Sequence, residues 1–454
     1  MNSNAVILFT RVPEAGKTKT RMMPYLSPEE CVALHESFLK DIIREAASAS
    51  ADLRVYATPR VDDPSFRALF PEGTSFFLQE GPDLGARMEA ALEETLKAGY
   101  RAAVLVGTDL PELRKEDFQC AFRVLEQRDV VLGPTRDGGY WLLGLSKPSH
   151  APFEPKTYGT SSVYENTLAG IEAAGLSVGT VRELEDMDER EDLAAFRERI
   201  RRNPALLNTE SGRYVTDHAK ISVIVPSYNE EKVLPTLLQQ LNRFRQPGNP
   251  FQGQLEFLFA DGGSTDGTLE LLRAGNWPVL SAPKGRANQM NAAAKEAKGD
   301  ILFFLHCDSE VPKDFPREIL EVMKRHEAGC FGIAYRTKES AMHINSFYAN
   351  HVRLPLQKIM FGDQGIFLTR ELFFRAGMFP PLPIMEDLQF SMTLRDMGVK
   401  PGLTKHRIYT SPRRHPEKGF VRQMISLHQY PKLRKLYREG VSIETISDIY
   451  KDIR

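Results

Sequence analysis

The chain has few of the features that mark secreted, membrane-spanning or nucleic-acid-binding proteins. Only 4 of its 454 residues are cysteine, too few for a disulfide framework, and none is paired at the spacing of a zinc site. No apolar run approaches the roughly 20 residues that a membrane-spanning helix needs. The opening MNSNAVILFTRVPEAGK lacks the layout of a signal peptide. With 59 basic and 60 acidic residues, the chain has no charge excess to attract nucleic acid. These absences predict a cytoplasmic protein without a nucleic-acid partner.

The length and the order of apolar segments predict two α/β domains. A chain of 454 residues is too long for one ordinary core. Strand-like apolar segments alternate with helical patterns in both halves, which is typical of mostly parallel sheets covered by helices. Between the halves, RRNPALLNTESGRYVTDHAK has no apolar period. We predict a domain at 1–205, a linker at 206–219 and a domain at 220–454. Each half opens on a strand and carries an Asp at the end of a later strand, which indicates distant repeats of one architecture.

The first half has a basic loop after its opening strand and two aspartates further on. The loop follows AVILFT and contains Gly16, Lys17, Lys19 and Arg21. Backbone N–H groups and cations in such a loop suit a phosphate, although the spacing is not that of a P-loop. Asp109 ends the buried strand of AAVLVGTDLPEL, and Asp188 precedes an acidic helix start. The alternatives are a solvated basic cluster and, for Asp188, a first-turn acid that the helix dipole favours.

This set of motifs resembles the nucleotidyltransferase-like group of the nucleotide-diphospho-sugar transferase (GT-A) superfamily. It is most similar to bacterial proteins related to molybdenum-cofactor guanylyltransferases, over most of residues 4–200. In that group the basic loop binds a nucleoside triphosphate, which implies this role for Gly16, Lys17, Lys19 and Arg21. The resemblance also implies metal binding by Asp109 and Asp188. The family's Gly-rich loop is reduced here to one glycine and a proline, which weakens the case for nucleotidyl transfer more than that for nucleotide binding.

The second half is organised around the stretch ILFFLHCDSE (301–310). Five apolar residues run into His306, Cys307 and Asp308, as expected of a strand buried on both faces that ends at the ligand-binding edge of a sheet. In an extended strand, His306 and Asp308 lie on the same side and can face one ligand. An aspartate there can hold a divalent cation against a diphosphate. The alternative is that Asp308 only caps the next element.

Three loop motifs precede this stretch in the order PSYNEE, DGGSTDGT and KGRANQMN. The order closely resembles the family 2 inverting glycosyltransferases, which have a GT-A fold and a nucleotide-sugar donor. The match covers residues 221 to about 415, and the wider similarity is to a branch assigned to arsenosugar biosynthesis. The two resemblances together imply an α/β protein of two tandem Rossmann-like GT-A domains with mostly parallel central sheets.

The second resemblance assigns roles to residues of these motifs. The slot for base and ribose matches Pro226, Tyr228, Glu230 and Asp261, and the cations for the diphosphate match Lys284 and Arg286. Asp308 corresponds to the second Asp of the family's Asp-x-Asp metal motif, and His306 stands in place of the first. Histidine suits Mn²⁺ better than Mg²⁺, and a supporting hydrogen bond is the alternative role for His306.

The pair Glu386-Asp387, at the start of an amphipathic helix, matches the family's ED motif, whose Asp is the general base toward the acceptor hydroxyl. Inverting transfer needs one carboxylate opposite the leaving group, and the alternative is two first-turn acids. SPRRHPEKGFVRQ stands where the family has a basic closing motif, without the usual Q-x-x-R-W form. There Arg413 and Arg414 could clamp the diphosphate, and His415 could complete the metal shell.

The sequence therefore predicts a metal-dependent glycosyltransferase, using Mn²⁺ or Mg²⁺, fused to a nucleotidyltransferase-like domain. It would move a sugar from a nucleoside diphosphate to a hydroxyl of a small or lipid acceptor, with inversion. The competing hypothesis is that one half is a non-catalytic module that binds a nucleotide sugar. The basic amphipathic tail at 428–454 has two interpretations, which are packing against the domain and peripheral contact with a membrane surface.

Overall fold

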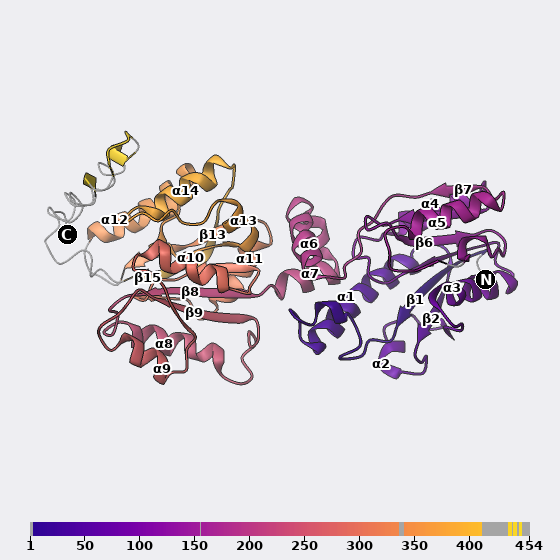
Figure 1. Ribbon diagram of the computed structural model, residues 1–454, viewed down its shortest axis with the longest axis horizontal. Helices are drawn as coiled ribbons and strands as arrows, with labels where there is room; N and C mark the ends of the chain where they lie inside the picture. The colour runs from indigo at the N-terminus through magenta and orange to yellow at the C-terminus, as the bar shows by residue number, and fades with distance from the viewer. Residues whose placement is uncertain are drawn as a thin grey trace. The chain divides into compact units, whose positions relative to one another are not determined.

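The computed structural model describes residues 3–154, 156–335, 340–410, 435–437, 439–442 and 445–446. The chain forms two compact units, Met1–Val215 and Thr216–Arg454, and each is built on one sheet (Figure 1). Within the described ranges, no helix is long and apolar enough to cross a membrane. The predicted α/β fold class, with mostly parallel central sheets, is confirmed in both units.

The first unit has a seven-stranded sheet with the order β3-β2-β1-β4-β6-β5-β7. The strands are β1 (Asn4–Arg11), β2 (Asp52–Thr58), β3 (Ser75–Leu78), β4 (Ala102–Val106), β5 (Val130–Pro134), β6 (Tyr140–Leu145) and β7 (Val178–Thr180). β6 runs antiparallel to both of its neighbours, and all other pairs are parallel. Successive residues of β1 are buried on opposite faces, which is why the segment reads as a continuous apolar run.

Helices cover both faces of this sheet. They are α1 (Pro28–Ala47), α2 (Pro64–Arg67), α3 (Leu84–Lys97), α4 (Lys115–Leu125), α5 (Val163–Ala173), α6 (Arg190–Arg202) and α7 (Glu210–Asp217), with short 3₁₀ turns η1 (Thr20–Met22), η2 (Ala151–Phe153) and η3 (Pro204–Asn208). One core lies between the sheet and α1, α2 and α4, and the other lies under α3 and α5. α1 begins at a capping box in which the Ser27 hydroxyl accepts from the Glu30 N–H and the Glu30 carboxylate accepts from the Ser27 N–H.

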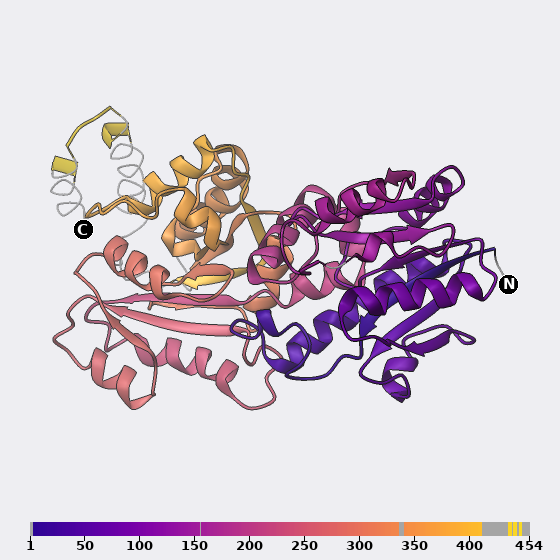
Figure 2. The ribbon, with the colours of Figure 1, turned by 45° about the vertical axis from the view of Figure 1, so that its right-hand side comes forward.

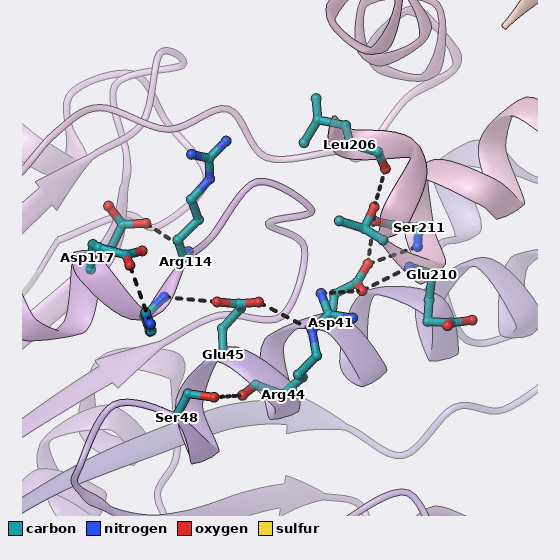
Figure 3. Close-up of polar contacts among 12 residues, drawn as sticks. Asp41, Arg44, Glu45, Ser48, Arg114, Asp117, Leu206, Glu210 and Ser211 are labelled. Carbon is teal, nitrogen blue, oxygen red and sulfur yellow. Dashed lines mark hydrogen bonds and ion pairs between the residues drawn. The ribbon is translucent and has the colours of Figure 1, made fainter. Parts of the chain in front are cut away.

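The segment 206–219, which the sequence predicts as a linker, contains most of η3 and all of α7. The N-terminus of α7 is held against α1 by Asp41, which is only 2% exposed (Figure 3). Its carboxylate accepts hydrogen bonds from the Glu210 N–H at 2.9 Å, the Ser211 N–H at 2.8 Å and the Ser211 hydroxyl at 2.6 Å. The residues up to Val215 therefore belong to the first compact unit.

The second unit has an eight-stranded sheet with the order β10-β9-β8-β11-β14-β13-β15-β12. The strands are β8 (Ile221–Ser227), β9 (Leu255–Asp261), β10 (Val279–Ser281), β11 (Ile301–Phe304), β12 (Ser309–Glu310), β13 (Ala328–Tyr335), β14 (Ile366–Thr369) and β15 (Gly402–Thr410). β14 is antiparallel to β11 and β13, and β12 is antiparallel to β15. The remaining pairs are parallel.

The helices of the second unit again form two layers. They are α8 (Leu234–Asn242), α9 (Thr268–Ala274), α10 (Arg286–Glu296), α11 (Phe315–Met323), α12 (Ser340–Tyr348), α13 (Arg370–Arg375) and α14 (Glu386–Asp396), with η4 (Arg243–Arg245), the π-helix η5 (Ala349–Gln357) and η6 (Gly362–Gln364). One core packs α8, α9 and α11 on the sheet, and the other packs α10, α13 and α14 on the opposite face. Figures 1 and 2 show α8 and α9 on the side of β8 and β9 away from α13 and α14.

The two sheets repeat one topology. β8, β9, β10 and β11 take the places of β1, β2, β3 and β4, and β14 is the antiparallel strand as β6 is. β13 and β15 correspond to β5 and β7, and β12 is the additional strand. Asp109 follows β4 and Asp308 follows β11, so the two aspartates lie after equivalent strands, as the idea of an architectural repeat requires.

Candidate functional sites

The first unit contains a cavity of about 560 Å³ whose wall includes residues from β1 and from the loop that follows β4. The carboxyl edge of a parallel sheet is the usual place for a ligand in such folds. Of the residues predicted to bind nucleotide or metal in this half, the cavity lining includes all but Gly16, namely Lys17, Lys19, Arg21, Asp109 and Asp188. The structure therefore brings together residues that are far apart in the sequence.

Lys19 lies between the two predicted metal ligands. Its ammonium nitrogen is 2.7 Å from Asp109 Oδ1 and 3.0 Å from Asp188 Oδ1, and it donates to the Met187 carbonyl. The lysine side chain is only 4% exposed, whereas both aspartates are 38% exposed. Lys19 has φ +50°, in the left-handed region, at the turn into η1. The local backbone thus turns the lysine inward, and its ammonium bridges the two carboxylates.

The electrostatics of this group follow from the two ion pairs. Burial by itself would lower the pKa of Lys19, but Asp109 and Asp188 outweigh it and raise that pKa above its ordinary value. Burial would likewise raise the pKa of Asp109, yet Lys19 and His35 hold that pKa well below its usual range. The group therefore contains a charged Lys19 ammonium and an ionised Asp109 carboxylate, and a divalent cation would have to displace Lys19 to bind both aspartates.

The other cations of the basic loop are solvent-exposed. Lys17 pairs with Glu14 at 3.1 Å, and Arg21 reaches Asp188 at 3.6 Å. Gly16 has φ +81° at the turn that returns the Lys17 N–H to the Glu14 carbonyl, so its role is in the backbone of the loop. Lys17 and Arg21 are the cations that an incoming phosphate can meet without breaking a buried pair.

Sequence reasoning missed three buried polar residues that line the cavity, Thr10, His35 and Thr108. His35, on α1, lies with Nδ1 3.5 Å from Asp109 Oδ1 and Nε2 3.5 Å from the Thr10 hydroxyl. The Thr10 and Thr108 hydroxyl oxygens are 3.0 Å apart. The signal in the sequence was a histidine on the apolar face of α1. Asp186, two residues before Asp188, was not predicted either; burial first, and then nearby carboxylates, raise its pKa to about 6.

In the second unit, the loops after β8 and β10 bring two of the predicted donor residues together. The Lys284 ammonium lies 4.1 Å from the centre of the Tyr228 ring. Tyr228 is itself exposed, so one lysine and one aromatic face are open to a ligand. The Glu230 N–H donates to the Thr268 hydroxyl, which joins this loop to the start of α9. Pro226 is the residue before the last in β8, and its carbonyl accepts from the Cys307 thiol at 3.4 Å.

Asp261 is almost fully buried, and its carboxylate organises the glycine turn that follows it. It accepts from the Gly263 N–H and the Ser264 N–H, both at 2.9 Å, and from the Ser264 hydroxyl at 2.5 Å. Gln289, on α10, ties the ends of β8 and β9 by donating to the carbonyls of Ser227 and Ala260. The contacts of Asp261 are thus those of a residue that shapes the loop. The sequence predicted a direct contact with the ligand and did not predict this structural role.

Arg286 and Glu386, predicted in different roles, form one ion pair. Arg286 begins α10 and Glu386 begins α14, and the guanidinium Nη2 lies 2.8 Å from Glu386 Oε1. Glu386 is 2% exposed and Arg286 is 33% exposed by side chain. The buried glutamate therefore orients the arginine, which remains accessible from one side.

His306, Gly362 and Asp387 converge beside the end of β11. The Gly362 N–H donates to Asp387 Oδ2 at 2.8 Å. A Cβ atom on Gly362 would lie 2.9 Å from His306 Nε2 and 3.4 Å from Asp387 Oδ2, so glycine is what permits this approach. Asp387 Oδ1 accepts from the Leu388 N–H. The structure thus places the predicted base and the histidine of the predicted metal motif next to one glycine.

The strand before this site is shorter than the sequence indicates. β11 ends at Phe304, and Cys307 and Asp308 lie in a turn that the Ser309 N–H closes onto the His306 carbonyl. The expectation that His306 and Asp308 share one side of an extended strand is therefore wrong. The apolar run continues past the strand because Leu305, His306 and Cys307 are themselves buried. Arg413, Arg414 and His415 lie outside the described residues.

Metal binding is constrained by the ligands present. Among the described side chains, no group of three or more His, Cys, Asp and Glu converges to hold a metal ion. Asp308 is partly exposed at the sheet edge and suits a hard cation that the phosphates of a substrate would complete. Asp109 and Asp188 fit a metal ion less well, because Lys19 already lies between them.

Two family models match separate parts of the chain. Residues 222–379 match "Glycosyl transferase family 2", and residues 42–160 match "Uncharacterized protein conserved in bacteria (DUF2064)". The second unit thus contains a family 2 glycosyltransferase domain, as the order of its loop motifs predicted.

Individual relatives match only part of the chain. An undecaprenyl-phosphate 4-deoxy-4-formamido-L-arabinose transferase from Pectobacterium carotovorum is 33% identical over 113 residues, which are 23% of this chain and 33% of that protein. The glycosyltransferase YfnE from Bacillus subtilis is 33% identical over 114 residues, 24% of this chain and 27% of that protein. The chain therefore spans about a third of the length of these curated relatives.

Solved structures also resemble parts of the molecule. A candidate nucleotide-diphospho-sugar transferase from Desulfovibrio desulfuricans G20 is 29% identical, with a TM-score of 0.46, over 48% of this chain and 96% of that one. The mannosyltransferase PcManGT from Pyrobaculum calidifontis, in complex with GDP-Man and Mn²⁺, is 21% identical, with a TM-score of 0.35, over 55% of this chain and 76% of that one.

Proposed function

We propose that this chain, whose residues 222–379 match glycosyl transferase family 2, moves a sugar from a nucleoside diphosphate sugar to an acceptor hydroxyl with inversion. The observation that carries the proposal is the convergence of His306, Gly362 and Asp387 at the end of β11, within a domain of this family. A carboxylate fixed at the sheet edge by a backbone N–H is a suitable acceptor for the proton of an attacking hydroxyl.

Each residue of this site has a separate proposed role. Tyr228 offers its ring to the base of the nucleotide, and Lys284 beside it meets the diphosphate. Arg286, oriented by Glu386, is the second diphosphate cation. Asp387 takes the proton of the acceptor hydroxyl, because the Gly362 N–H fixes the position of its carboxylate at the sheet edge. Glu386 is then a positioning residue.

A divalent ion would be held in this unit by Asp308, with His306 nearby. The ion would supply positive charge to the leaving diphosphate, which is a large source of rate in such reactions. Mn²⁺ is at least as suitable as Mg²⁺ because a histidine is close. Mn²⁺ in the similar mannosyltransferase complex belongs to that protein and is consistent with this choice.

The test is a donor and acceptor screen with the full chain. We expect one nucleotide sugar to raise the melting temperature with Mn²⁺ present, and acceptor-dependent release of the nucleoside diphosphate. NMR of the product should show the opposite anomeric configuration to that of the donor. The acceptor panel includes polyprenyl phosphates, small polyols and an arsenic-bearing hydroxyl compound, the last as the test of the arsenosugar assignment. Retention of configuration, or no donor bound in any arm, would contradict the proposal.

For the first unit we propose nucleotide binding in the cavity lined by Lys17, Lys19 and Arg21. Two outcomes distinguish a nucleotidyltransferase from a non-catalytic module. Release of pyrophosphate from a nucleoside triphosphate and a sugar phosphate indicates the enzyme. Binding of a nucleotide sugar without turnover indicates the module. The variant Arg21→Ala should weaken either ligand, and Arg101→Ala, an exposed arginine of the same unit outside the cavity, is the control.

A further inference from the structure

The most exposed large apolar side chains of the described chain lie on one short segment. They are Leu356 at 75%, Phe347 at 62% and Ile344 at 52%, with Tyr348 at 40%. Ile344, Phe347 and Tyr348 have the spacing i, i+3, i+4 and therefore share one face of α12, and Leu356 follows on η5. We call these four residues the α12–η5 patch. Singly exposed apolar residues are ordinary, but a group of this kind marks an interaction surface.

The segment that carries the patch has polar side chains turned toward the protein. Ser346 and Asn350 are buried, and both donate to the Ile333 carbonyl at 2.5 and 3.0 Å. Asn350 also accepts from the Ile333 N–H. Arg353 is buried and donates to Gln364 Oε1 at 2.6 Å. Ala349 and Leu354 are buried beside these polar anchors. Large apolar groups on the outer face are nevertheless unusual for a surface helix, whose outer face is ordinarily polar, and they suit an apolar environment.

The composition of the segment identifies that environment. From Ser340 to Met360 the sequence contains no Asp or Glu. Arg353 is buried, so the basic side chain at the surface of this segment is that of Lys358, with the exposed His343 and His351 on the same segment. The exposed rings are one Phe and one Tyr, and the Phe347 ring lies 4.7 Å from that of His351. Aromatic and aliphatic side chains with basic but no acidic neighbours favour an interface with anionic lipid.

The patch is connected to the proposed transfer site. Arg353 holds Gln364, the last residue of η6, and Gly362 begins that same turn and donates to Asp387. Figure 1 shows α12 in the layer of α14, whose first turn carries Asp387. A membrane in contact with the patch would therefore touch η5, the element whose Arg353 supports the turn beside the proposed base.

We propose that the α12–η5 patch docks this chain onto the surface of a lipid bilayer, with Phe347 and Leu356 inserted among the lipids. Docking goes beyond the proposed sugar transfer and needs neither donor nor acceptor. It offers the transfer site to acceptors presented at a membrane surface.

The experiment is flotation of the full chain with vesicles of phosphatidylcholine and phosphatidylglycerol in equal parts. The patch variant is Phe347→Ser with Leu356→Ser. The matched control is Met397→Ser with Leu403→Ser, two residues of the same unit that are 42% and 39% exposed. Because both pairs are at the surface, neither should disturb folding. We expect wild type and control to float equally and the patch variant to bind at least about tenfold more weakly, as insertion scales with buried apolar area.

Three results would overturn the proposal. They are a wild-type chain that does not float, a patch variant that floats as well as wild type, and a control that weakens as much as the patch variant. Sedimentation velocity tests the competing occupant, a second copy of this chain. If wild type is a dimer that the patch variant splits, and vesicles bind neither, the patch is a protein interface. Failure of flotation says nothing against donor binding, which the screen with nucleotide sugars measures separately.

Discussion

The equivalent strands β4 and β11 are both followed by an aspartate, but the two units surround it differently. In the first unit Lys19 reaches from the loop after β1 and binds Asp109 and Asp188 together, almost fully buried. In the second unit the two predicted diphosphate cations have other partners. Lys284 lies over the Tyr228 ring, and Arg286 pairs with Glu386. At this sheet edge the first unit therefore pairs its aspartates with a lysine of the protein. In the second unit the predicted cations Lys284 and Arg286 pair with Tyr228 and Glu386.

This difference suggests that the two units bind nucleotides with different dependence on metal. An ammonium that bridges two carboxylates offsets part of their charge without a metal ion, and a buried pair of this kind is costly to break. Asp308 at the other sheet edge is partly exposed and suits a hard cation that the phosphates of a substrate would complete. The four substitutions below each change one side of this comparison.

The largest effect is expected for Asp387→Asn. If Asp387 is the base, the variant should lose about a thousandfold in kcat and keep its donor affinity, since general-base catalysis commonly contributes 10²–10⁴-fold. The amide oxygen of asparagine can still accept from the Gly362 N–H, so the loop should be preserved. Asp396→Asn, on the exposed end of the same helix, is the control. A variant that loses donor binding while it transfers each bound sugar at the normal rate would show that the role is wrong.

The next effect distinguishes the two sheet edges. Asp308→Ala should lower donor turnover by roughly a hundredfold or more, because charge stabilisation of the leaving diphosphate is lost. Excess chelator should abolish activity of the wild-type chain for the same reason. Asp109→Ala in the first unit should leave sugar transfer unchanged, which makes it the matched control. Full activity in chelator would contradict a metal role for Asp308.

The sequence predicted the parts of these sites that depend on local pattern. The apolar runs before Asp109 and Asp308 indicated the two strands and the sheet edge at which we expect ligands, and the resemblance supplied roles for the loops. What it missed are contacts across the fold. Lys19 meets Asp188 over 169 residues of separation, and no periodicity encodes that pairing. The sequence likewise gives no sign that Arg286 and Glu386 interact. Only the packing of α10 and α14 brings them together as an ion pair.

Inference from local sequence pattern also missed structure where buried residues do not form a strand. The buried stretch after Phe304 read as strand because its residues are apolar, although the chain turns there. The segment 206–219 read as a linker because its apolar residues are few and irregularly spaced. Its helix α7 is instead held by the buried carboxylate of Asp41 on a distant element (Figure 3). In both cases a tertiary contact decided what propensity left open.

A third substitution should convert the first sheet edge toward the type of the second. Lys19→Met removes the ammonium and leaves Asp109 and Asp188 facing each other. The variant should lose about 1–2 kcal/mol of stability, a value reduced because the acids are partly exposed. Mn²⁺ should restore it, with affinity about tenfold above wild type, since two carboxylates suit such an ion. Thermal melts with and without Mn²⁺ measure both effects. Lys17→Met, at the exposed end of the loop, should show neither.

The smallest effect is expected for Glu386→Gln, which tests whether Arg286 needs its orienting partner. The amide oxygen can still accept from the guanidinium, but a charge-assisted bond becomes a neutral one. Arg286 should then sample other positions, and the KM for the nucleotide sugar should rise about fivefold with kcat nearly unchanged, as loss of uniform binding predicts. Arg286→Ala should raise KM at least as much. In the double variant the two effects should not add, because both act through one ion pair. A large fall in kcat for Glu386→Gln would instead assign Glu386 to the chemical step, so a double-mutant cycle on KM and kcat decides its role.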